Sequence, residues 1–298
     1  MGIGSCGKAT RKQRAEIVLG LMPEYPLKGL LRLSGLARST YYYIIGNRQS
    51  SRHEAARKEI MRIFEAHKGR YGYRRICEEL RRNGHKTNHK TVQRLMRELG
   101  LKGKCRKAYR YRSYKGEVGK TAENLLDRKF GASRPYEKLT TDITQFDING
   151  TKVYLSPVMD LYSREILAYD VSLSAGMMQI RNMLRGLFSV LPEGARPLFH
   201  SDQGWQYQHE EYRKCLSEHG IMQSMSRKGN CLDNSVMENF FGRLKTEMYY
   251  GERFRKVKEF IKELKNYIEY YNNDRISLGL NGMSPVQYRL HYGVQGYD

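Results

Sequence analysis

The sequence predicts a multidomain protein with α-helical units in its front half and an α/β domain, followed by a C-terminal helix, in its back half. The net charge of +22 lies entirely in residues 1–134, which hold 33 Lys and Arg against 11 Asp and Glu, whereas residues 135–298 hold 20 of each. Apolar residues recur at helical spacing before residue 101, and strand-like runs alternate with helix-like runs after residue 138. The two halves are therefore expected to be separate, and the first to bind a polyanion.

The composition argues against several classes of protein. No apolar run approaches the roughly 18 residues that a membrane span needs. The five cysteines are scattered and form no C-x-x-C pair, which argues against a disulfide framework and against a cysteine zinc site. We expect a cytoplasmic protein with no membrane attachment.

Residues 1–50 are expected to form a helix-turn-helix unit. Leu27–Leu33 and Ala37–Ile45 have the pattern of two short helices, and Ser34-Gly35-Leu36 between them is typical of a turn. The residues of the second helix that we expect to contact DNA are Arg38, Ser39 and Tyr41.

Residues 51–101 predict a second helical DNA-binding unit with helices at His53–His67, Tyr73–Asn83 and Asn88–Leu99. Nine basic residues within residues 70–97 face only two acidic ones, which favours nucleic-acid contact over a merely solvated surface. Residues 102–134 are expected to be a basic linker with interleaved tyrosines, suited to phosphates and exposed bases. The candidate contacts in these two segments are Arg74, Arg75, Arg94, Lys104, Arg106, Lys107 and Arg110.

Residues 135–250 predict the α/β domain. Leu139–Ile148 and Lys152–Leu161 should form a hairpin around Asn149-Gly150, with a third strand at Glu165–Leu173. Helices and strands then alternate at Met177–Val190, Arg196–Ser201, Glu210–His219, Ile221–Ser226 and Asp233–Tyr249. This order is the ribonuclease-H-like arrangement. Residues 251–298 should form a helical tail, with a helix at about Arg255–Asn272.

Three acidic residues of this domain are candidates for a metal site. Asp142 lies within the first strand, Asp202 follows a strand, and Glu238 lies on a helix, with 59 and 35 residues between them. Ends of strands converge in open sheets, and Mg²⁺ prefers carboxylate oxygens. A helical projection places Lys245 on the same polar line as Glu238, where it could reach a DNA phosphate.

Four other acids compete for these roles: Asp147, Asp160, Asp170 and Asp233. Asp233 is expected to be the N-cap of its helix, and Asp160 to pair with Arg164 as a structural group. Nothing in the pattern assigns a role to Asp147 or Asp170.

The spacing of the three acids resembles that of the D,D(35)E transposases of bacterial insertion sequences, which are similar to retroviral integrases. The segments that carry the resemblance are His200-Ser201-Asp202-Gln203-Gly204, Gly229-Asn230-Cys231-Leu232-Asp233-Asn234 with Glu238, Phe240-Phe241-Gly242, Leu244-Lys245 and Glu247, Arg70-Tyr71-Gly72-Tyr73-Arg74, and Tyr271-Asn272-Asn273 with Arg275. It covers roughly residues 27–290. Leu139 stands where members often have Trp, and the retroviral His-His-Cys-Cys zinc module is absent from the sequence.

The resemblance implies an integrase-like catalytic core that cuts and joins DNA strands at element ends. Asp142, Asp202 and Glu238 would be the catalytic triad and hold two Mg²⁺ ions, for which Mn²⁺ could substitute, and Lys245 would contact DNA. The implied partners are double-stranded DNA of element ends and target, further copies of the chain on that DNA, and a first-reading-frame partner or fusion. The implied place is the bacterial cytoplasm, at the nucleoid.

Two alternatives stay open at this point. One is another ribonuclease-H-like nuclease, such as a ribonuclease or a junction resolvase. The other is a non-catalytic DNA-binding regulator, which the helix-turn-helix and the charge would support equally well.

Overall fold

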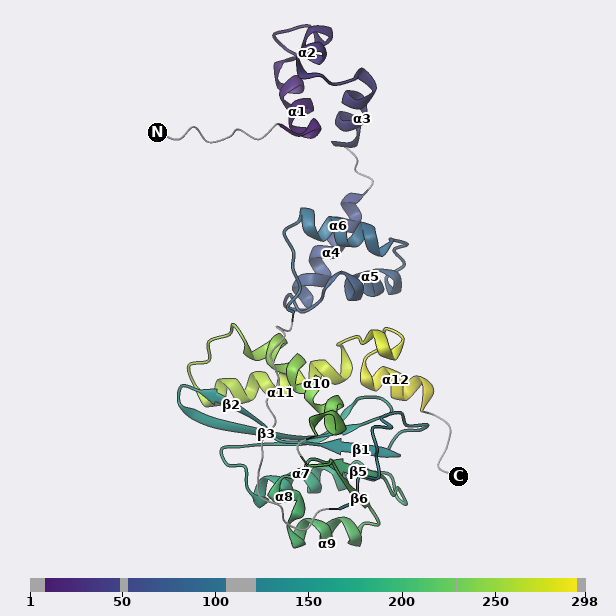
Figure 1. Ribbon diagram of the computed structural model, residues 1–298, viewed down its shortest axis with the longest axis vertical. Coiled ribbons are helices and arrows are strands. Elements are labelled where there is room, and N and C mark those ends of the chain that lie inside the picture. The colour runs from purple at the N-terminus through teal and green to yellow at the C-terminus, as the bar shows by residue number, and fades with distance from the viewer. Residues whose placement is uncertain (1–8, 49–52, 106–121, 229, 294–298) are drawn as a thin grey trace.

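The computed structural model describes residues 9–48, 53–105, 122–228 and 230–293, and Figure 1 shows two helical units followed by an α/β domain. The basic residues Arg106, Lys107 and Arg110 lie outside the described residues. None of the described helices is long and apolar enough to cross a membrane.

The first unit is a three-helix bundle formed by α1 (Arg11–Leu21), α2 (Leu27–Ser34) and α3 (Arg38–Arg48). The last two helices confirm the expected helix-turn-helix, and Gly35 ends α2 in the left-handed conformation (φ 62°) that a glycine adopts without strain. The first helix was not expected. Its start is nevertheless encoded by a capping box, in which Thr10 and Gln13 satisfy each other's backbone amides.

The second unit contains α4 (Glu54–Ala66), α5 (Tyr73–Arg82) and α6 (His89–Glu98), as expected. Asn88 caps α6 by accepting a hydrogen bond from the Lys90 amide at 2.9 Å. The apolar faces of the three helices share one core, to which Ile276 from the far end of the chain also contributes. This unit is therefore packed against the C-terminal region.

The expected first strand is divided into β1 (Lys138–Thr141) and β2 (Thr144–Ile148), with Asp142 in the break. The prediction of one continuous strand was wrong in this respect. Both parts keep the same register against β3 (Thr151–Asp160), and that register places Pro157 opposite Asp142. Proline cannot donate a backbone hydrogen bond to a neighbouring strand, which gives a physical reason for the interruption.

Within the part of the chain that the structure describes, the sheet has six strands. β4 (Ile166–Ser172) pairs with the outer edge of β3, while β1 pairs in parallel with β5 (Leu198–Ser201), which pairs in parallel with β6 (Met222–Met225). Helices α7 (Met177–Phe188) and α9 (Glu210–Glu218) pack on one face, and α8 (Trp205–Gln208) is a single turn after β5. The mixed sheet confirms the ribonuclease-H-like arrangement.

The opposite face of the sheet is covered by α10 (Ser235–Leu244) and α11 (Val257–Asn273), as Figure 1 shows. The single helix expected over Asp233–Tyr249 is instead a 3₁₀ turn at Cys231–Asn234, then α10, then a π-helical turn at Lys245–Tyr249. Because α11 shares a hydrophobic core with β2, β3 and α10, it is built into the α/β domain. A last helix, α12 (Pro285–Tyr292), begins with a capping box of Ser284 and Gln287.

Candidate active site

The pairing of β1 with β5 brings Asp142 and Asp202 together. Thr140 is the partner of His200, so the same register carried two residues further sets Asp142 beside Asp202. Both strands are parallel and end at this edge, and neighbouring strands lie about 4.8 Å apart. Each carboxylate is also held by the local backbone: Asp142 accepts from the Ile143 amide at 2.7 Å, and Asp202 accepts from the Gly204 amide at 2.9 Å.

The pKa of Asp142 is shifted by the groups around its carboxylate. Burial of its carboxyl group is the main reason that the pKa of Asp142 lies well above its ordinary value, and the negative charges of Asp202 and Glu238 raise it further. The Ile143 amide and the Lys245 ammonium act in the opposite direction. Of the four groups expected from the sequence, Asp202, Glu238 and Lys245 therefore all act on the charge of Asp142 in the folded chain.

Glu238 is placed by the anchoring of the start of α10. The Asn234 side chain accepts a hydrogen bond from the Thr140 hydroxyl at 2.7 Å and donates one to the Thr141 carbonyl at 3.1 Å. Asn234 is 4% exposed, and both the oxygen and the nitrogen of its side-chain amide bond the end of β1. This residue ties the helix that carries Glu238 to the strand that precedes Asp142, a role that the sequence alone did not reveal.

Lys245 is the first residue of the π-helical turn. Its Nζ lies 5.3 Å from the centroid of the buried Phe146 ring on β2, within the range of a cation–π contact. Burial lowers the pKa of Lys245, and the nearby charge of Asp142 opposes that effect. The lysine is thus half-buried within the site and is not an ordinary surface side chain.

His200 holds the strand that ends at Asp202. Its ring hydrogen bonds with the Ser224 hydroxyl at 2.9 Å through Nδ1 and with the Ser226 hydroxyl at 3.1 Å through Nε2. Burial lowers the pKa of His200 to about 4, so the ring is neutral near pH 7. The imidazole therefore links β5 to β6 and to the residue that follows β6. In the sequence, only the position of His200 two residues before Asp202 indicated this role.

Two competing acids have structural roles that differ from those expected. Asp233 does not cap α10: it is fully buried, and it accepts hydrogen bonds from Arg227, Arg128 and Asn124. The bonds from Arg227 are the main reason that its pKa lies well below the ordinary value.

Asp160 was expected to pair with Arg164. Its carboxylate instead accepts from the amide and hydroxyl of Ser163 and from the Tyr136 amide, while Arg164 donates to the Phe130 carbonyl. Of the two remaining acids, Asp147 bonds the Gly150 amide in the β2–β3 turn, and Asp170 is half-buried on β4.

Glu247 joins the second helical unit to the α/β domain. Its buried carboxylate accepts from Arg275 at 2.6 and 2.8 Å, from the Tyr267 hydroxyl at 3.0 Å and from Arg75 of α5 at 3.3 Å. Arg75 was expected to contact DNA, but its guanidinium is used inside the protein. Lys104, another expected contact, bonds the Glu247 carbonyl and pairs with Glu252.

The remaining expected DNA contacts differ in accessibility. Arg38 and Ser39 are exposed on α3, whereas Tyr41 is 1% exposed and its hydroxyl contacts the Met22 sulfur. A DNA contact by the Tyr41 ring is therefore incompatible with this packing, because the ring belongs to the core of the first unit. The exposed rings of α3 are Tyr42 and Tyr43.

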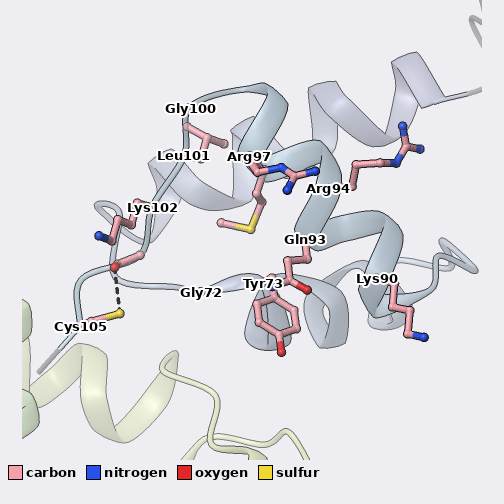
Figure 2. Close-up of a pocket in the computed structure, with 12 residues that line it drawn as sticks. Gly72, Tyr73, Lys90, Gln93, Arg94, Arg97, Gly100, Leu101, Lys102 and Cys105 are labelled. Atoms are coloured by element: carbon pink, nitrogen blue, oxygen red, sulfur yellow. Dashed lines mark hydrogen bonds between the residues drawn. The ribbon is translucent and has the colours of Figure 1, made fainter. Parts of the chain in front are cut away.

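In the second unit, Arg74 and Arg94 lie on the surface, and Arg94 pairs with Glu98. A cavity of about 660 Å³ lies between α6, the start of α5 and the segment that follows α6. Figure 2 shows the residues that line this cavity, among them the basic side chains of Lys90, Arg94 and Arg97 on α6 and of Lys102 after it.

No group of three or more His, Cys, Asp or Glu side chains within the described parts of the chain is arranged to hold a metal ion by itself. The charges of Asp202 and Glu238 act on Asp142, but among the described residues these three carboxylates form no closed cage.

Comparison with known proteins places these features in a family. Residues 132–231 and 238–292 match families described as integrase core domain, and residues 51–109 match one described as HTH-like domain. The putative transposase InsK for insertion sequence element IS150 of Escherichia coli (strain K12) is 50% identical over 266 residues, covering 89% of this chain and 94% of that protein. An uncharacterized transposase-like protein of Haemophilus influenzae is 57% identical over 204 residues, covering 68% of this chain and 94% of that protein.

Among solved structures, a chain of the simian T-cell lymphotropic virus intasome in complex with PP2A regulatory subunit B56 gamma is similar, with a TM-score of 0.45 and 14% identity over 70% of this chain and 69% of that chain. The sequence relatives decide the family. The chain belongs to the bacterial insertion-sequence transposases whose catalytic core is of the retroviral-integrase type.

Proposed function

We propose that this chain binds the ends of an insertion sequence and catalyses metal-dependent cleavage and transfer of DNA strands, with Asp142, Asp202 and Glu238 as the catalytic carboxylates. The observation that carries the proposal is the register of β1 against β5, which sets Asp142 beside Asp202 at one edge of the sheet. The charge of Glu238 acts at the same point.

The donor set suits divalent cations of the Mg²⁺ type. Carboxylate oxygens are hard ligands, and Mg²⁺ is usually held by one or two carboxylates together with water and substrate phosphates, so a closed protein cage is not required. Burial is the main reason that the pKa of Asp142 is raised, and the charges of Asp202 and Glu238 add to it; a bound cation would relieve that repulsion. Two such ions, with Mn²⁺ as a substitute for Mg²⁺, would activate the attacking oxygen and stabilise the leaving one.

The chain's own side chains then orient the DNA around that site. The ammonium of Lys245, half-buried over Phe146, is within electrostatic reach of Asp142 and is suited to a phosphate next to the scissile bond. Asn234 and His200 act as positioning residues, because they fix α10 and β5 on either side of the carboxylates.

The partner that fits the rest of the molecule is double-stranded DNA. The excess positive charge lies in residues 1–134, and the side chains of Arg38, Ser39, Arg74 and Arg94 are exposed there, where phosphates or bases could reach them. We further propose that the chain acts as a homo-oligomer on that DNA, together with a first-reading-frame partner or fusion, at the bacterial nucleoid.

The test is strand cleavage and joining of element-end duplex in Mg²⁺ by Asp142→Asn, Asp202→Asn and Glu238→Gln. Each change removes a metal-binding charge and little volume, so activity should fall below a few per cent of wild type while DNA affinity is kept. Asp170→Asn, at a half-buried acid elsewhere on the sheet, is the matched control and should stay active. Activity above a few per cent in a triad variant would refute that residue's role, and preferred cleavage of an RNA–DNA hybrid would point to a ribonuclease.

A further inference from the structure

A second cavity adjoins α10 on the side away from the catalytic carboxylates. Its volume is about 290 Å³, and its wall includes Arg164 from the β3–β4 connection, Asn239 and Arg243 from α10, and Ser277 from the segment after α11. Nothing in the strand-transfer chemistry proposed above uses these residues.

The residues of α10 fall into separate stripes around the helix axis at 100° per residue. Met237, Phe241 and Leu244 face the hydrophobic core, and Glu238 and Lys245 lie along the catalytic rim. Arg243 is 140° around the helix from Glu238, on the far side, and lines the cavity with Val236 and Asn239. The cavity and the catalytic rim are thus separated by about one helix diameter, ~10 Å.

The stripe between them, which faces away from the core, is made of small side chains. It consists of Ser235, Gly242 and Thr246, all of them partly exposed. A DNA backbone could lie close against the helix along this stripe, with one phosphate at the catalytic rim and another at the cavity.

The cavity is rich in positive charge. Burial, and the neighbouring charge of Arg243, lower the pKa of Arg164. One nitrogen of the Arg164 guanidinium, Nη1, is buried without a hydrogen-bond partner, and Arg243 has no ion-pair partner among the described residues. The acid that acts on Arg164, Asp160, already accepts bonds from Ser163 and Tyr136.

Two guanidinium groups that share a cavity destabilise the fold unless an anion balances their charge, and one of them also has a buried donor without an acceptor. Guanidinium donors match the oxygens of a phosphate in geometry as well as in charge. The hydroxyl of Ser277 adds a neutral group that can bond a further oxygen.

We propose that this cavity is a phosphate-binding site in which Arg243 and Arg164 hold one phosphate group, supplied by the backbone of DNA as it crosses α10 or by free inorganic phosphate. The DNA source rests on the function proposed above. Such a contact would fix the path of the strand over the helix without touching the metal site.

The test combines Arg243→Ala with single neutral methylphosphonate substitutions along a duplex that carries the element's terminal sequence, using the full chain without metal. Arg196→Ala is the matched control, since Arg196 is exposed and precedes β5 at the end opposite Asp202. Arg243→Ala should bind the duplex about 10-fold more weakly and reduce the salt slope by about 0.9. Arg196→Ala should change neither quantity.

At one position, the methylphosphonate should weaken DNA binding by the wild type by a similar factor. The same substitution should not weaken binding by Arg243→Ala any further, because both changes remove the same contact. A parallel titration with inorganic phosphate, followed by thermal unfolding of the wild type and Arg243→Ala, identifies the second source. Stabilisation of the wild type alone, without any such DNA position, assigns the site to free phosphate.

The proposal is overturned if no DNA position depends on Arg243 and inorganic phosphate stabilises both proteins equally. A wild-type chain that fails to bind the duplex would refute the proposed function instead, and the phosphate titration would still decide the cavity.

Discussion

Glu247→Gln tests whether the buried ion pair at the π-helical turn holds the second helical unit and the catalytic domain together. The substitution keeps the shape of the side chain and removes its charge. Arg275, only 1% exposed, would lose the carboxylate that it contacts at 2.6 and 2.8 Å, and Arg75 would lose its partner at 3.3 Å.

The expected cost follows from leaving a buried charge without its partner. Breaking a buried pair in this way costs about 3–5 kcal/mol. Burial by itself would raise the pKa of Glu247, but the hydrogen bond and charge of Arg275 outweigh it and leave that pKa below its ordinary value, so the carboxylate is ionised near pH 7. For a domain of this size, the loss corresponds to a fall in unfolding temperature of roughly 6–20 °C.

The assay is calorimetric unfolding of the full chain at pH 7, with Glu252→Gln as the control. Glu252 forms an ion pair with Lys104 at 2.9 Å, but its side chain is 51% exposed, and such a pair contributes about 1 kcal/mol or less. Equal unfolding temperatures for the two variants would refute the argument that Glu247 is the central group of this contact.

Three further predictions concern charge. Lys245→Ala should keep its fold and lose most joining of a pre-cut element end, whereas Lys245→Arg should keep part of it; joining at the wild-type rate by the alanine variant would make this lysine a bystander. Residues 1–134 should bind duplex DNA with a log–log salt slope of about −0.9 for each phosphate neutralised, and a slope near zero would contradict the electrostatic account. Because the pKa of Asp233 is lowered in the folded chain, its stabilisation is present above the ordinary aspartate pKa of about 3.9 and is lost as the pH falls below it. The difference between the unfolding temperatures at pH 7 and at pH 3 should therefore be smaller in Asp233→Asn than in the wild type. An equal difference in the two proteins would contradict a stabilising role for the ion pairs of Asp233.

Patterns that depend on neighbouring residues were predictable from the sequence. The helices of the second unit follow from apolar spacing and from Asn88 as a cap, and the hairpin follows from Asn149-Gly150. The spacing of the three candidate acids singled out Asp202 and Glu238, whose charges act on Asp142 in the folded chain.

Features that depend on distant partners were not predictable. The break at Asp142 reflects Pro157 on the opposite strand, and the use of Arg75 inside the protein requires Glu247, 172 residues away. Tyr41 shows the same limit: helical spacing placed it on α3, but only the packing against α1 and α2 decided that it faces inward. The boundaries of the five segments expected from the sequence stay predictions. The helix α11, which was expected in the C-terminal tail, shares the hydrophobic core of the sheet.

The central claim, that the three carboxylates hold catalytic metal ions, is tested most directly by Asp202→Cys in Mg²⁺ and in Mn²⁺. A thiolate is a soft ligand that Mg²⁺ binds poorly and Mn²⁺ accepts more readily. The variant should bind element-end DNA, fail to join it in Mg²⁺ and regain joining in Mn²⁺, while Asp170→Cys joins in both. Joining by Asp202→Cys at the wild-type rate in Mg²⁺, or the same residual activity in both metals, would contradict a metal-binding role for Asp202.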